Sequence, residues 1–429
     1  MIRTDKMGVA GFADVPKTPN SLETLQATCR EEITARCVRL YGPQLRSIIL
    51  TGSLARGEAT FSVSNGRAKL LGDAELILVF HESSPLPEAL GVGSTSRSAE
   101  AALARIGLEC HVELAAVHPK FLRRTKPHIF AYELRDCGRV LWGDRNILRL
   151  IPAFASSAIP REDAWQLLCN RMIEMLELAA DLTVESKGLL PGLIYRTVKL
   201  YLDMATSLLL FAGAYESTYQ RRAERLESLA GRSSDPMEFP FDLRQFSQRV
   251  TLCTRWKLSA TREDDLCTLL TDGESSSASW EEAVAYARLL WTWELERLTH
   301  CSGQVPIREL MKKWMRSQRL WHRLRGWLYV LRREAWFRSR REWRRWARLA
   351  WQASPRYWVY AAASELFFRL PCLALQRSVA PQVNGDWKQV YEWLPRHSSS
   401  EQAVEEITWR ALAAEIVANY ESFLTGTRS

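Results

Sequence analysis

The segment that most constrains the fold lies between residues 47 and 80, where two apolar runs flank a turn of small residues and a pair of acids. The first run ends at Leu50 and is long enough for a buried strand, which breaks at Gly52. The second run follows Asp73 and Glu75. Side chains alternate along a strand, so both acids must point to the same face. The segment therefore predicts two buried strands, with a small-residue turn after the first and two carboxylates at the start of the second.

The turn and the acids have the chemistry needed to hold a nucleoside triphosphate and its cations. Gly52 has no Cβ, so its backbone can approach a ligand, and the N–H groups of Ser53 and Leu54 would face outward at a helix start, where an anion is favoured. Asp73 and Glu75 would repel each other at the end of a buried strand unless cations neutralise them. Hard divalent ions with oxygen ligands, chiefly Mg²⁺, are their natural partners.

A third acid is expected nearby, and the strand-like apolar run of residues 110–117 supplies one in Glu113. In a two-ion site the metals sit roughly 3.5–4 Å apart and stabilise both the attacking and the leaving oxygen of a displacement. Glu113 could also take the proton from the attacking hydroxyl. Glu109 has the same strand parity but sits at the start of the run, and His111 shares that face as a hydrogen-bonded neighbour. We therefore expect Glu113 to complete the set of metal ligands.

At these residues the sequence resembles the polymerase-β-like nucleotidyltransferase superfamily. The signature of that superfamily is an apolar strand, Gly-Ser, a short helix, acid-x-acid on the next strand and a third acid on a later strand. The matching residues here are Gly52, Ser53, Asp73, Glu75 and Glu113. With Glu in the second acidic position, the motif looks more like the bacterial antibiotic nucleotidyltransferases than like the Asp-x-Asp form common elsewhere in the superfamily.

The resemblance implies transfer of a nucleoside monophosphate, with AMP as the first expectation, from an NTP to a hydroxyl, with release of pyrophosphate. It implies two Mg²⁺ ions as cofactors. Asp73 and Glu75 would bind both ions, and Glu113 would bind one and serve as the base. Gly52 and Ser53 would hold the terminal phosphates.

One departure from the superfamily is the length of the connection between the turn and the acids. Nineteen residues separate Ser53 from Asp73, more than the superfamily usually has. Asn65-Gly66, between two short alternating segments, is a strong signal for a two-residue hairpin. The extra length is therefore predicted to project as a β-hairpin that leaves the carboxylates undisturbed.

Three cations near this insertion are candidate phosphate contacts. Arg56, Arg67 and Lys69 could reach the phosphates, and each could instead belong to an ordinary solvated surface. Arg56 is the first choice because it lies next to the turn.

The chain is long enough for two or three domains, and its periodicity predicts an α+β architecture. A nucleotidyltransferase domain with a small mixed β-sheet would precede a helical domain. The predicted divisions are an N-terminal arm over residues 1–20, the catalytic domain over 21–160, a helical substrate or nucleotide-wall domain over 161–305 and an Arg/Trp-rich helical region over 306–429.

Local patterns predict the individual elements. Helices are expected near residues 21–41, 99–106, 161–185, 190–212, 217–230 and 279–300, a short strand over 139–144, a Ser/Gly-rich linker over 91–98 and a loop over 231–240.

Lys199 is a candidate contact to the phosphate or base of the nucleotide. The segment from Tyr195 to Arg222 resembles the helix pair that walls the nucleotide pocket in many bacterial members of the superfamily. An alternative for Lys199 is an ion pair with Asp203, four residues further along the same helix, worth a few tenths of a kcal/mol.

The second unusual feature is a basic, tryptophan-rich segment over residues 312–348. It holds fourteen Lys or Arg and two Glu, a net charge of +12 against +9 for the whole protein. Trp321, Leu324, Leu328 and Leu331 share helical spacing, so one or two amphipathic helices are expected. Three uses fit these residues: docking to an anionic bilayer, binding of nucleic acid, or a tryptophan core with a solvated arginine rim.

Other sequence features bear on the compartment and on metals. The nine cysteines are scattered, with no Cys-x-x-Cys pair, which argues for a reducing cytosol and against structural zinc. Residues 1–20 lack the apolar core of a signal peptide, and the longest apolar stretch, 204–213, is about half the ~20 residues of a spanning helix. We therefore expect a cytoplasmic protein, with peripheral membrane association as an alternative.

These observations together predict an enzyme that moves an NMP from Mg-NTP to a hydroxyl of a small molecule, such as an aminoglycoside or a sugar. A protein side chain or an RNA end is the second choice of acceptor. A rival from another class is a catalytically silent scaffold that docks to membrane or nucleic acid through residues 312–348. The oligomeric state is left open.

Overall fold

The computed structural model describes a subset of the chain, to which every structural statement below refers. The described stretches are residues 22–64, 67–181, 191–232, 238–259, 276–301, 305–333, 343–370, 387–395 and 408–424. The predicted N-terminal arm over residues 1–20 therefore lies outside the described residues.

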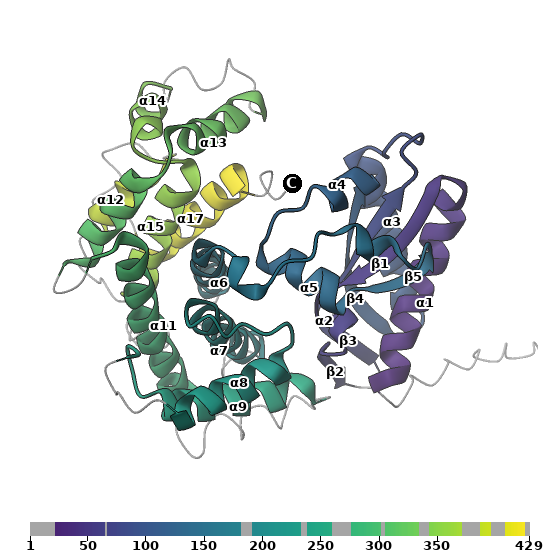
Figure 1. The fold of residues 1–429 in the computed structure, drawn as a ribbon, viewed down its shortest axis with the longest axis horizontal. Coiled ribbons are helices and arrows are strands. Elements are labelled where there is room, and N and C mark those ends of the chain that lie inside the picture. The colour runs from purple at the N-terminus through teal and green to yellow at the C-terminus, as the bar shows by residue number, and fades with distance from the viewer. Residues whose placement is uncertain are drawn as a thin grey trace, which may run out of the picture. The chain divides into compact units, whose positions relative to one another are not determined.

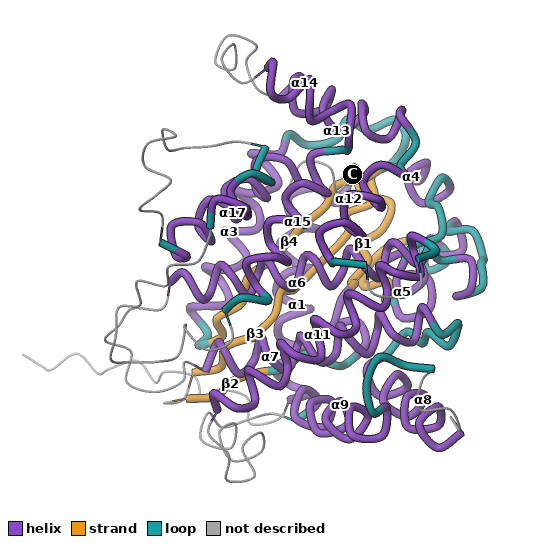
Figure 2. The backbone as a smooth tube through the Cα atoms, turned by 90° about the vertical axis from the view of Figure 1, so that its left-hand side faces the viewer, coloured by secondary structure: helices purple, strands orange, loops and turns teal. Residues whose placement is uncertain are grey.

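These residues fold into two compact units. The first contains residues 22–123 and Gly138–Leu150, and the second contains Arg124–Cys137 and the described chain from Ile151 onward. Every described strand belongs to the first unit, and the second is built from helices (Figure 2). The predicted α+β class is confirmed at this level. The predicted boundaries between the four parts of the chain stay predictions.

The first unit combines helices with five strands. Its elements are α1 (Leu22–Tyr41), β1 (Leu45–Thr51), α2 (Gly52–Arg56), β2 (Phe61–Ser64), β3 (Arg67–Phe80), α3 (Ala89–Arg105), β4 (Leu108–Val117), α4 (Pro119–Arg123) and β5 (Arg139–Gly143), with short 3₁₀ turns at Gly42–Gln44 and Ile147–Leu150. The expected helix over 21–41 and the expected strand over 139–144 are thus confirmed.

The strands form one small mixed sheet. Its order is β2-β3-β1-β5, and β4 pairs with the other edge of β3. The β3–β4 pair is parallel, and the other pairs are antiparallel. Because β3 is long, β2 pairs with its first residues and β1 with its last. The centre of β3 therefore lies where the turn after β1 meets the sheet.

The core of the first unit lies between the sheet and two helices, α1 and α3 (Figure 1). Alternate residues of β3, Leu76, Leu78 and Phe80, pack into it together with Ile33 of α1 and Leu103 of α3. Asp73 and Glu75 occupy the other parity of the strand, so core packing on one face fixes the direction of both acids on the other.

The prediction of a Ser/Gly-rich linker over 91–98 is wrong, because α3 spans Ala89–Arg105 without a break. Glycine and serine have low intrinsic helix propensity. Thr95, Ala99, Ala102 and Leu103 nevertheless recur at helical spacing and are buried against the sheet. Tertiary packing thus outweighs local propensity here.

The predicted hairpin insertion is present as a pair of antiparallel strands. β2 pairs with β3 from Phe61 opposite Leu70 to Ser64 opposite Arg67, and the two connecting residues, 65 and 66, lie outside the described residues. The second arm of the hairpin is the first part of β3 itself, a strand of 14 residues that continues to the acids. The insertion therefore extends the acid-bearing strand.

The second unit is helical. Its elements are α5 (Ile129–Cys137), a 3₁₀ turn (Ser156–Ala158), α6 (Arg161–Asp181), α7 (Pro191–Phe211), α8 (Tyr219–Arg232), α9 (Leu243–Leu258), α11 (Ser276–Thr299), α12 (Ile307–Ser317), α13 (Leu320–Arg333), α14 (Trp343–Gln352), α15 (Pro355–Phe367), α16 (Lys388–Tyr391) and α17 (Trp409–Leu424). The helices expected near 161–185, 190–212, 217–230 and 279–300 are confirmed by α6, α7, α8 and α11.

Helix α9 was not predicted, although its sequence carries a start signal. The side chain of Asp242 accepts hydrogen bonds from the N–H groups of Arg244 and Gln245, which is the geometry of an N-cap. Phe246 and Val250 then follow at helical spacing and are buried. Part of the expected loop over 231–240 is also helical, because α8 continues to Arg232.

The basic segment contains three helices, α12, α13 and α14, where one or two were expected. Trp327 and Trp346 are buried, and their indole N–H groups donate to the carbonyl oxygens of Ala353 and Pro395. Trp321 is 64% exposed, so the expected stripe is not the buried face. The tryptophans therefore divide between core and surface.

One further finding concerns hydropathy. Within the described stretches, no helix combines the length and the apolar character that crossing a bilayer requires.

Candidate active site

The site begins at the turn where β1 ends and α2 starts. Thr51 is extended, with φ −130° and ψ −173°, and its side chain makes no capping hydrogen bond. Gly52 has φ +68°, a left-handed conformation that favours glycine. The first N–H groups of a helix have no partner within that helix. The helix thus starts directly at the end of a buried strand. That its first N–H groups bind phosphate stays a prediction.

Glu75 lies directly against this turn. Thr51 and Glu75 are register partners in the β1–β3 pair. A Cβ added to Gly52 would lie 3.0 Å from each of three Glu75 atoms, Cδ, Oε1 and Oε2. Equal distances to all three mean that the plane of the carboxylate faces the glycine backbone. A Cβ at position 52 would push the carboxylate aside by a few tenths of an ångström, so the close approach favours glycine here, as its φ does.

The third predicted acid lies beside the first two. In the parallel β3–β4 pair, Glu113 is the register partner of Glu75, and His111 is the register partner of Asp73. Neighbouring residues on adjacent strands share a face of the sheet. Asp73 and Glu113 are exposed, and Glu75 is half-buried. The topology thus brings the acids of two separate segments to one patch of the sheet.

A bulge precedes Asp73. Between Lys69 and Asp73, β3 advances four residues while β4 advances from Glu109 to His111, so the strand carries two extra residues. A bulge bends a strand and re-aims the side chains that follow it. The hairpin arm of β3 therefore ends at an irregularity, and the acids lie on the regular part of the strand beyond it.

The next question is whether the three acids could bind magnesium. In the described part of the chain, no three His, Cys, Asp or Glu side chains are placed to hold a metal as they stand. Their chemistry nevertheless fits a hard cation, because Asp73, Glu75 and Glu113 offer only carboxylate oxygens. To share an ion, the exposed side chains of Asp73 and Glu113 would have to turn toward Glu75.

The two competing residues of β4 have other partners. The Glu109 carboxylate lies 3.8 Å from the Lys69 ammonium, and both side chains are more than half exposed. His111 Nδ1 lies 2.8 Å from the Glu100 carboxylate of α3. Glu113 is the acid of this strand that lies opposite Glu75, which favours it as the third ligand.

Glu100 was missed by sequence reasoning. One of its oxygens also accepts a hydrogen bond of 2.9 Å from the backbone N–H of Val112, which ties α3 to β4. The sequence signal that points to Glu100 is the helical spacing of the residues of α3 that are buried. Because residues 91–98 were expected to be a linker, the orientation of Glu100 toward the sheet was not considered.

An open groove of about 680 Å³ runs between α3 and β4. Its lining includes Asp73 and Glu113 from the strands and Arg97 and Glu100 from the helix. Three carboxylates against one guanidinium give this groove an acidic character. A ligand that carries positive charge would therefore be favoured in it over one that carries negative charge.

The predicted phosphate contacts on the loop have different surroundings. The Arg56 Nε lies 2.7 Å from the Glu58 carboxylate, and both side chains are almost fully buried. This ion pair is part of the packing at the end of α2. The phosphate contact of Arg56 stays a prediction. Arg67 is exposed at the start of β3, and Lys69 pairs with Glu109.

Lys199 belongs to the second unit, on α7. Its ammonium lies 5.7 Å from the centre of the Tyr195 ring. The carboxylate of Asp203, the alternative partner considered for it, accepts a hydrogen bond of 2.6 Å from Arg171. The contact between Lys199 and a nucleotide stays a prediction.

The tyrosines near α8 pack around a buried arginine. Arg222 lies over the rings of Tyr215 and Tyr219, at 4.9 and 5.2 Å from their centres. It also pairs with Glu133 of α5, which accepts a hydrogen bond of 2.6 Å from the Tyr215 hydroxyl. This network supports a packing role for both tyrosines.

Comparison with known proteins adds no relative. No protein-family model matches this sequence, and no curated protein matches it. We therefore interpret the site from its own residues.

Proposed function

We propose that this protein is a nucleotidyltransferase that moves an NMP, first of all AMP, from Mg-NTP to a hydroxyl of a small molecule. The observation that carries the proposal is the position of Glu75. Its carboxylate faces the Gly52 backbone and is also the register partner of Glu113. A phosphate-binding turn, a carboxylate pair and a third acid from another segment are thereby contiguous, as in the polymerase-β-like fold that the sequence resembles.

Each residue has a defined task in this reaction. The backbone N–H groups at Gly52 and Ser53 would donate to the terminal phosphates. Asp73, Glu75 and Glu113 would hold two Mg²⁺ ions, which when bound neutralise charge on the attacking and leaving oxygens. Glu113 would accept the proton of the acceptor hydroxyl. The hydroxyl oxygen then bonds to the α-phosphorus, the bond from that phosphorus to the α,β-bridging oxygen breaks, and pyrophosphate leaves.

The choice of acceptor rests on the resemblance to the antibiotic nucleotidyltransferases. The charge of the groove does not decide it, because the two Mg²⁺ ions would neutralise Asp73 and Glu113 and leave Glu100 balanced by Arg97. A small hydroxylated molecule, such as an aminoglycoside or a sugar, is the first choice. A protein side chain or an RNA end is the second.

The proposal is tested by pyrophosphate release from ATP and Mg²⁺ against a panel of acceptors. We expect Asp73→Asn to lower the turnover with the best acceptor at least ~10³-fold, because electrostatic stabilisation of the transferred group is usually the largest catalytic term. Glu109→Gln is the matched control, since Glu109 is an exposed acid on the same sheet that pairs with Lys69. Equal turnover in wild type and Asp73→Asn would refute the proposal.

Calorimetric titration separates the enzyme from a catalytically silent scaffold. An active site requires ATP binding that depends on Mg²⁺ and is lost in Asp73→Asn. The scaffold predicts that the variant and the wild type behave alike, whether both bind ATP or neither does.

The exposed surface of the basic segment favours a second candidate function, association with an anionic membrane from the cytoplasmic side. Trp321 and Leu328 of α13 are 64% and 44% exposed, and Trp351, on α14 just beyond the basic segment, is 69% exposed. Arg325 of α13 and Arg319 just before it are exposed as well. Indole rings at the interface and arginines among acidic headgroups are typical of surface-bound amphipathic helices.

Co-sedimentation with vesicles tests this second function. Binding to phosphatidylglycerol vesicles should exceed binding to phosphatidylcholine vesicles, and should fall with added salt. The double variant Trp321→Ser/Trp351→Ser should bind at least several-fold less. Equal sedimentation with both lipids, or no effect of the double variant, would exclude this surface as the docking site.

A further inference from the structure

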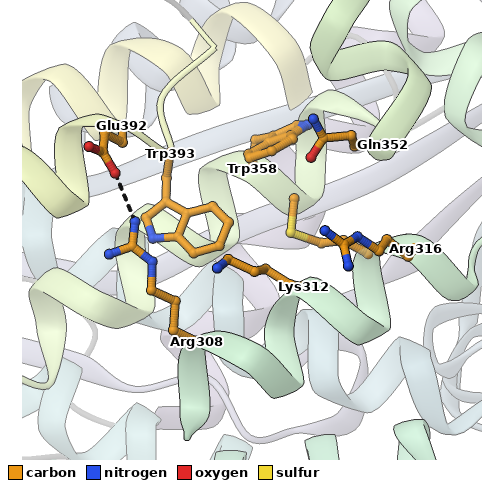
Figure 3. A pocket seen from close by; sticks show the side chains of 8 residues that line it. Arg308, Lys312, Arg316, Gln352, Trp358, Glu392 and Trp393 are labelled. Carbon is orange, nitrogen blue, oxygen red and sulfur yellow. Dashed lines mark hydrogen bonds and ion pairs between the residues drawn. The ribbon is translucent and has the colours of Figure 1, made fainter.

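A small cavity in the second unit has the lining of an anion site. Its volume is about 160 Å³, and its walls come from α12, from the end of α14, from α15 and from the turn after α16. Figure 3 shows the side chains of α12 rising along one wall and two indole rings forming the opposite one. This cavity lies among helices that the proposed nucleotidyl transfer does not use.

One face of α12 supplies three cations to the cavity. Arg308, Lys312 and Arg316 are spaced by four residues, so they lie along the same side of the helix. Glu392 is the only acid among the lining residues. The lining therefore carries a net charge of +2.

Arg308 is committed to holding the wall together. Its guanidinium lies 3.0 Å from the Glu392 carboxylate, donates to the Gln389 side chain at 3.1 Å and lies 5.0 Å from the centre of the Trp393 ring. This pairing, drawn in Figure 3, fastens α16 to α12 and neutralises both charges. Lys312 and Arg316 are therefore the cations that determine what the cavity binds.

Lys312 and Arg316 are available to a ligand. Lys312 pairs with Glu309 at 2.8 Å, but this is an exposed pair one turn away on the same helix, worth about 1 kcal/mol or less. Within the described part of the chain, the guanidinium of Arg316 makes no hydrogen bond or ion pair. A bound anion would therefore gain two charged donors without breaking a strong internal contact.

The tryptophans opposite these cations present carbon faces. Trp358 donates its indole N–H to the Leu349 carbonyl at 3.4 Å, and Trp393 donates to the Glu365 carboxylate at 2.6 Å. Their ring centres are 5.6 Å apart, at an angle of 48°. With both N–H groups occupied, the rings offer apolar contact and no polar recognition.

We propose that this cavity binds the phosphate group of a phosphate monoester, with Lys312 and Arg316 contacting the phosphate and Trp358 and Trp393 packing against the first carbons of the ester. Two positive charges match the dianion of a monoester. A volume of 160 Å³ is small beside the ~300–1,000 Å³ of sites that enclose a whole ligand, so the rest of the molecule extends outside. The phosphate can come from a soluble ester or from the headgroup of phosphatidic acid.

Calorimetric titration of the full chain with glycerol 3-phosphate, and with acetate as a singly charged comparison, tests the soluble source. Wild type should bind glycerol 3-phosphate at least ~10-fold more tightly than acetate. Lys312→Gln/Arg316→Gln should weaken binding at least ~10-fold, whereas Arg244→Gln, which removes an exposed arginine on α9 outside the cavity, should not. Co-sedimentation with vesicles containing phosphatidic acid or phosphatidylglycerol tests the lipid source, for which phosphatidic acid should be preferred and the preference lost in the double variant.

Two results would overturn the proposal. One is the absence of binding to both glycerol 3-phosphate and phosphatidic acid. The other is equal binding by wild type and Lys312→Gln/Arg316→Gln. Thermal unfolding of the double variant guards against misfolding, and Trp358→Phe, which keeps an aromatic face, should retain binding. Asp73→Asn should bind the phosphate probe as wild type does, so failure here is separable from failure of the nucleotidyltransferase proposal.

Discussion

Two aspartates, Asp73 in the first unit and Asp203 in the second, have opposite surroundings. In the first unit Asp73 is exposed on the sheet, near Glu75 and Glu113, which carry the same charge. In the second unit Asp203 is buried and hydrogen-bonded at 2.6 Å to Arg171, which is buried as well. A buried acid that stays ionised needs a paired cation, whereas like charges gathered at a surface repel one another unless a ligand neutralises them. The difference separates a residue that maintains the fold from a residue that we propose binds a ligand.

The largest expected effect is on the buried pair. Asp203→Asn should lower the free energy of unfolding by about 3–5 kcal/mol, because it leaves the Arg171 charge buried with weaker compensation. Chemical denaturation followed by far-ultraviolet circular dichroism measures this. Glu177→Gln is the control, since Glu177 forms a half-exposed pair with Arg196 at 3.5 Å and should cost less than about 1 kcal/mol. Similar losses in both variants would mean that burial does not set the strength of the pair.

Two glycines with the same backbone conformation sharpen the comparison. Gly52 and Gly213 have φ of +68° and +69°, but an added Cβ would meet the Glu75 carboxylate at position 52 and nothing at position 213. Both substitutions to alanine should cost about 1–2 kcal/mol of stability through backbone strain. Only Gly52→Ala should also displace Glu75, the proposed metal ligand, with a loss of turnover of about 10²-fold. Pyrophosphate release by both variants measures the difference, and equal turnover would separate Gly52 from the chemistry.

The features of the fold and of the candidate site that could be predicted are those determined by residues close together in the sequence. The placement of Asp73 and Glu75 was predictable because strand alternation beside an apolar run fixes the face of each residue. The pairing of β3 with β4 made Glu113 the partner of Glu75, and the apolar run around Glu113 was its only trace in the sequence. The ion pair between Arg56 and Glu58 was not predictable, because it depends on the conformation of the loop that follows α2.

The other differences between the predicted and the observed structure arise from tertiary contacts. Helix α3 runs through a segment rich in glycine and serine because its small residues pack on the sheet. In the basic segment, Trp327 is buried and Trp321 exposed, although both fit an amphipathic helix. Gly326 lies on the side of α13 that packs against α15, because a Cβ at this position would lie 2.9 Å from Pro355 at the start of α15. Such a contact between distant segments leaves no periodic trace in the sequence.

The fully buried acid Glu294 gives a smaller, pH-dependent effect. Burial raises the pKa of Glu294 to about 8, although a hydrogen bond from Ser207 and the charge of Arg297 oppose the shift. The native state then holds one more proton than the unfolded state between about pH 4.5 and pH 8, so its stability falls as pH rises through that range. The loss is complete above pH 8.

Glu294→Gln should remove this slope. We expect the variant to lose on the order of 2 kcal/mol less than wild type between pH 5 and pH 8, measured by urea denaturation at both values. Glu281→Gln, an exposed position on the same helix, should keep the wild-type slope. A wild-type stability that rises over this interval, with the slope unchanged in Glu294→Gln, would show that this carboxyl is ionised in the folded protein.

The smallest effect on stability should come from the proposed catalytic acid itself. Asp73→Asn removes one of three neighbouring like charges and no buried contact, so the free energy of unfolding should stay within about 1 kcal/mol of wild type, on the stabilising side. Saturating Mg-ATP should then show whether the charge of Asp73 serves ligand binding. A ligand at 100 times its dissociation constant raises the free energy of unfolding by about 2.7 kcal/mol. Thermal unfolding with and without Mg-ATP should show this gain in wild type and not in Asp73→Asn. If Asp73→Asn instead destabilised the protein as strongly as Asp203→Asn, the acid would be a structural residue, and the contrast between the two units would not hold.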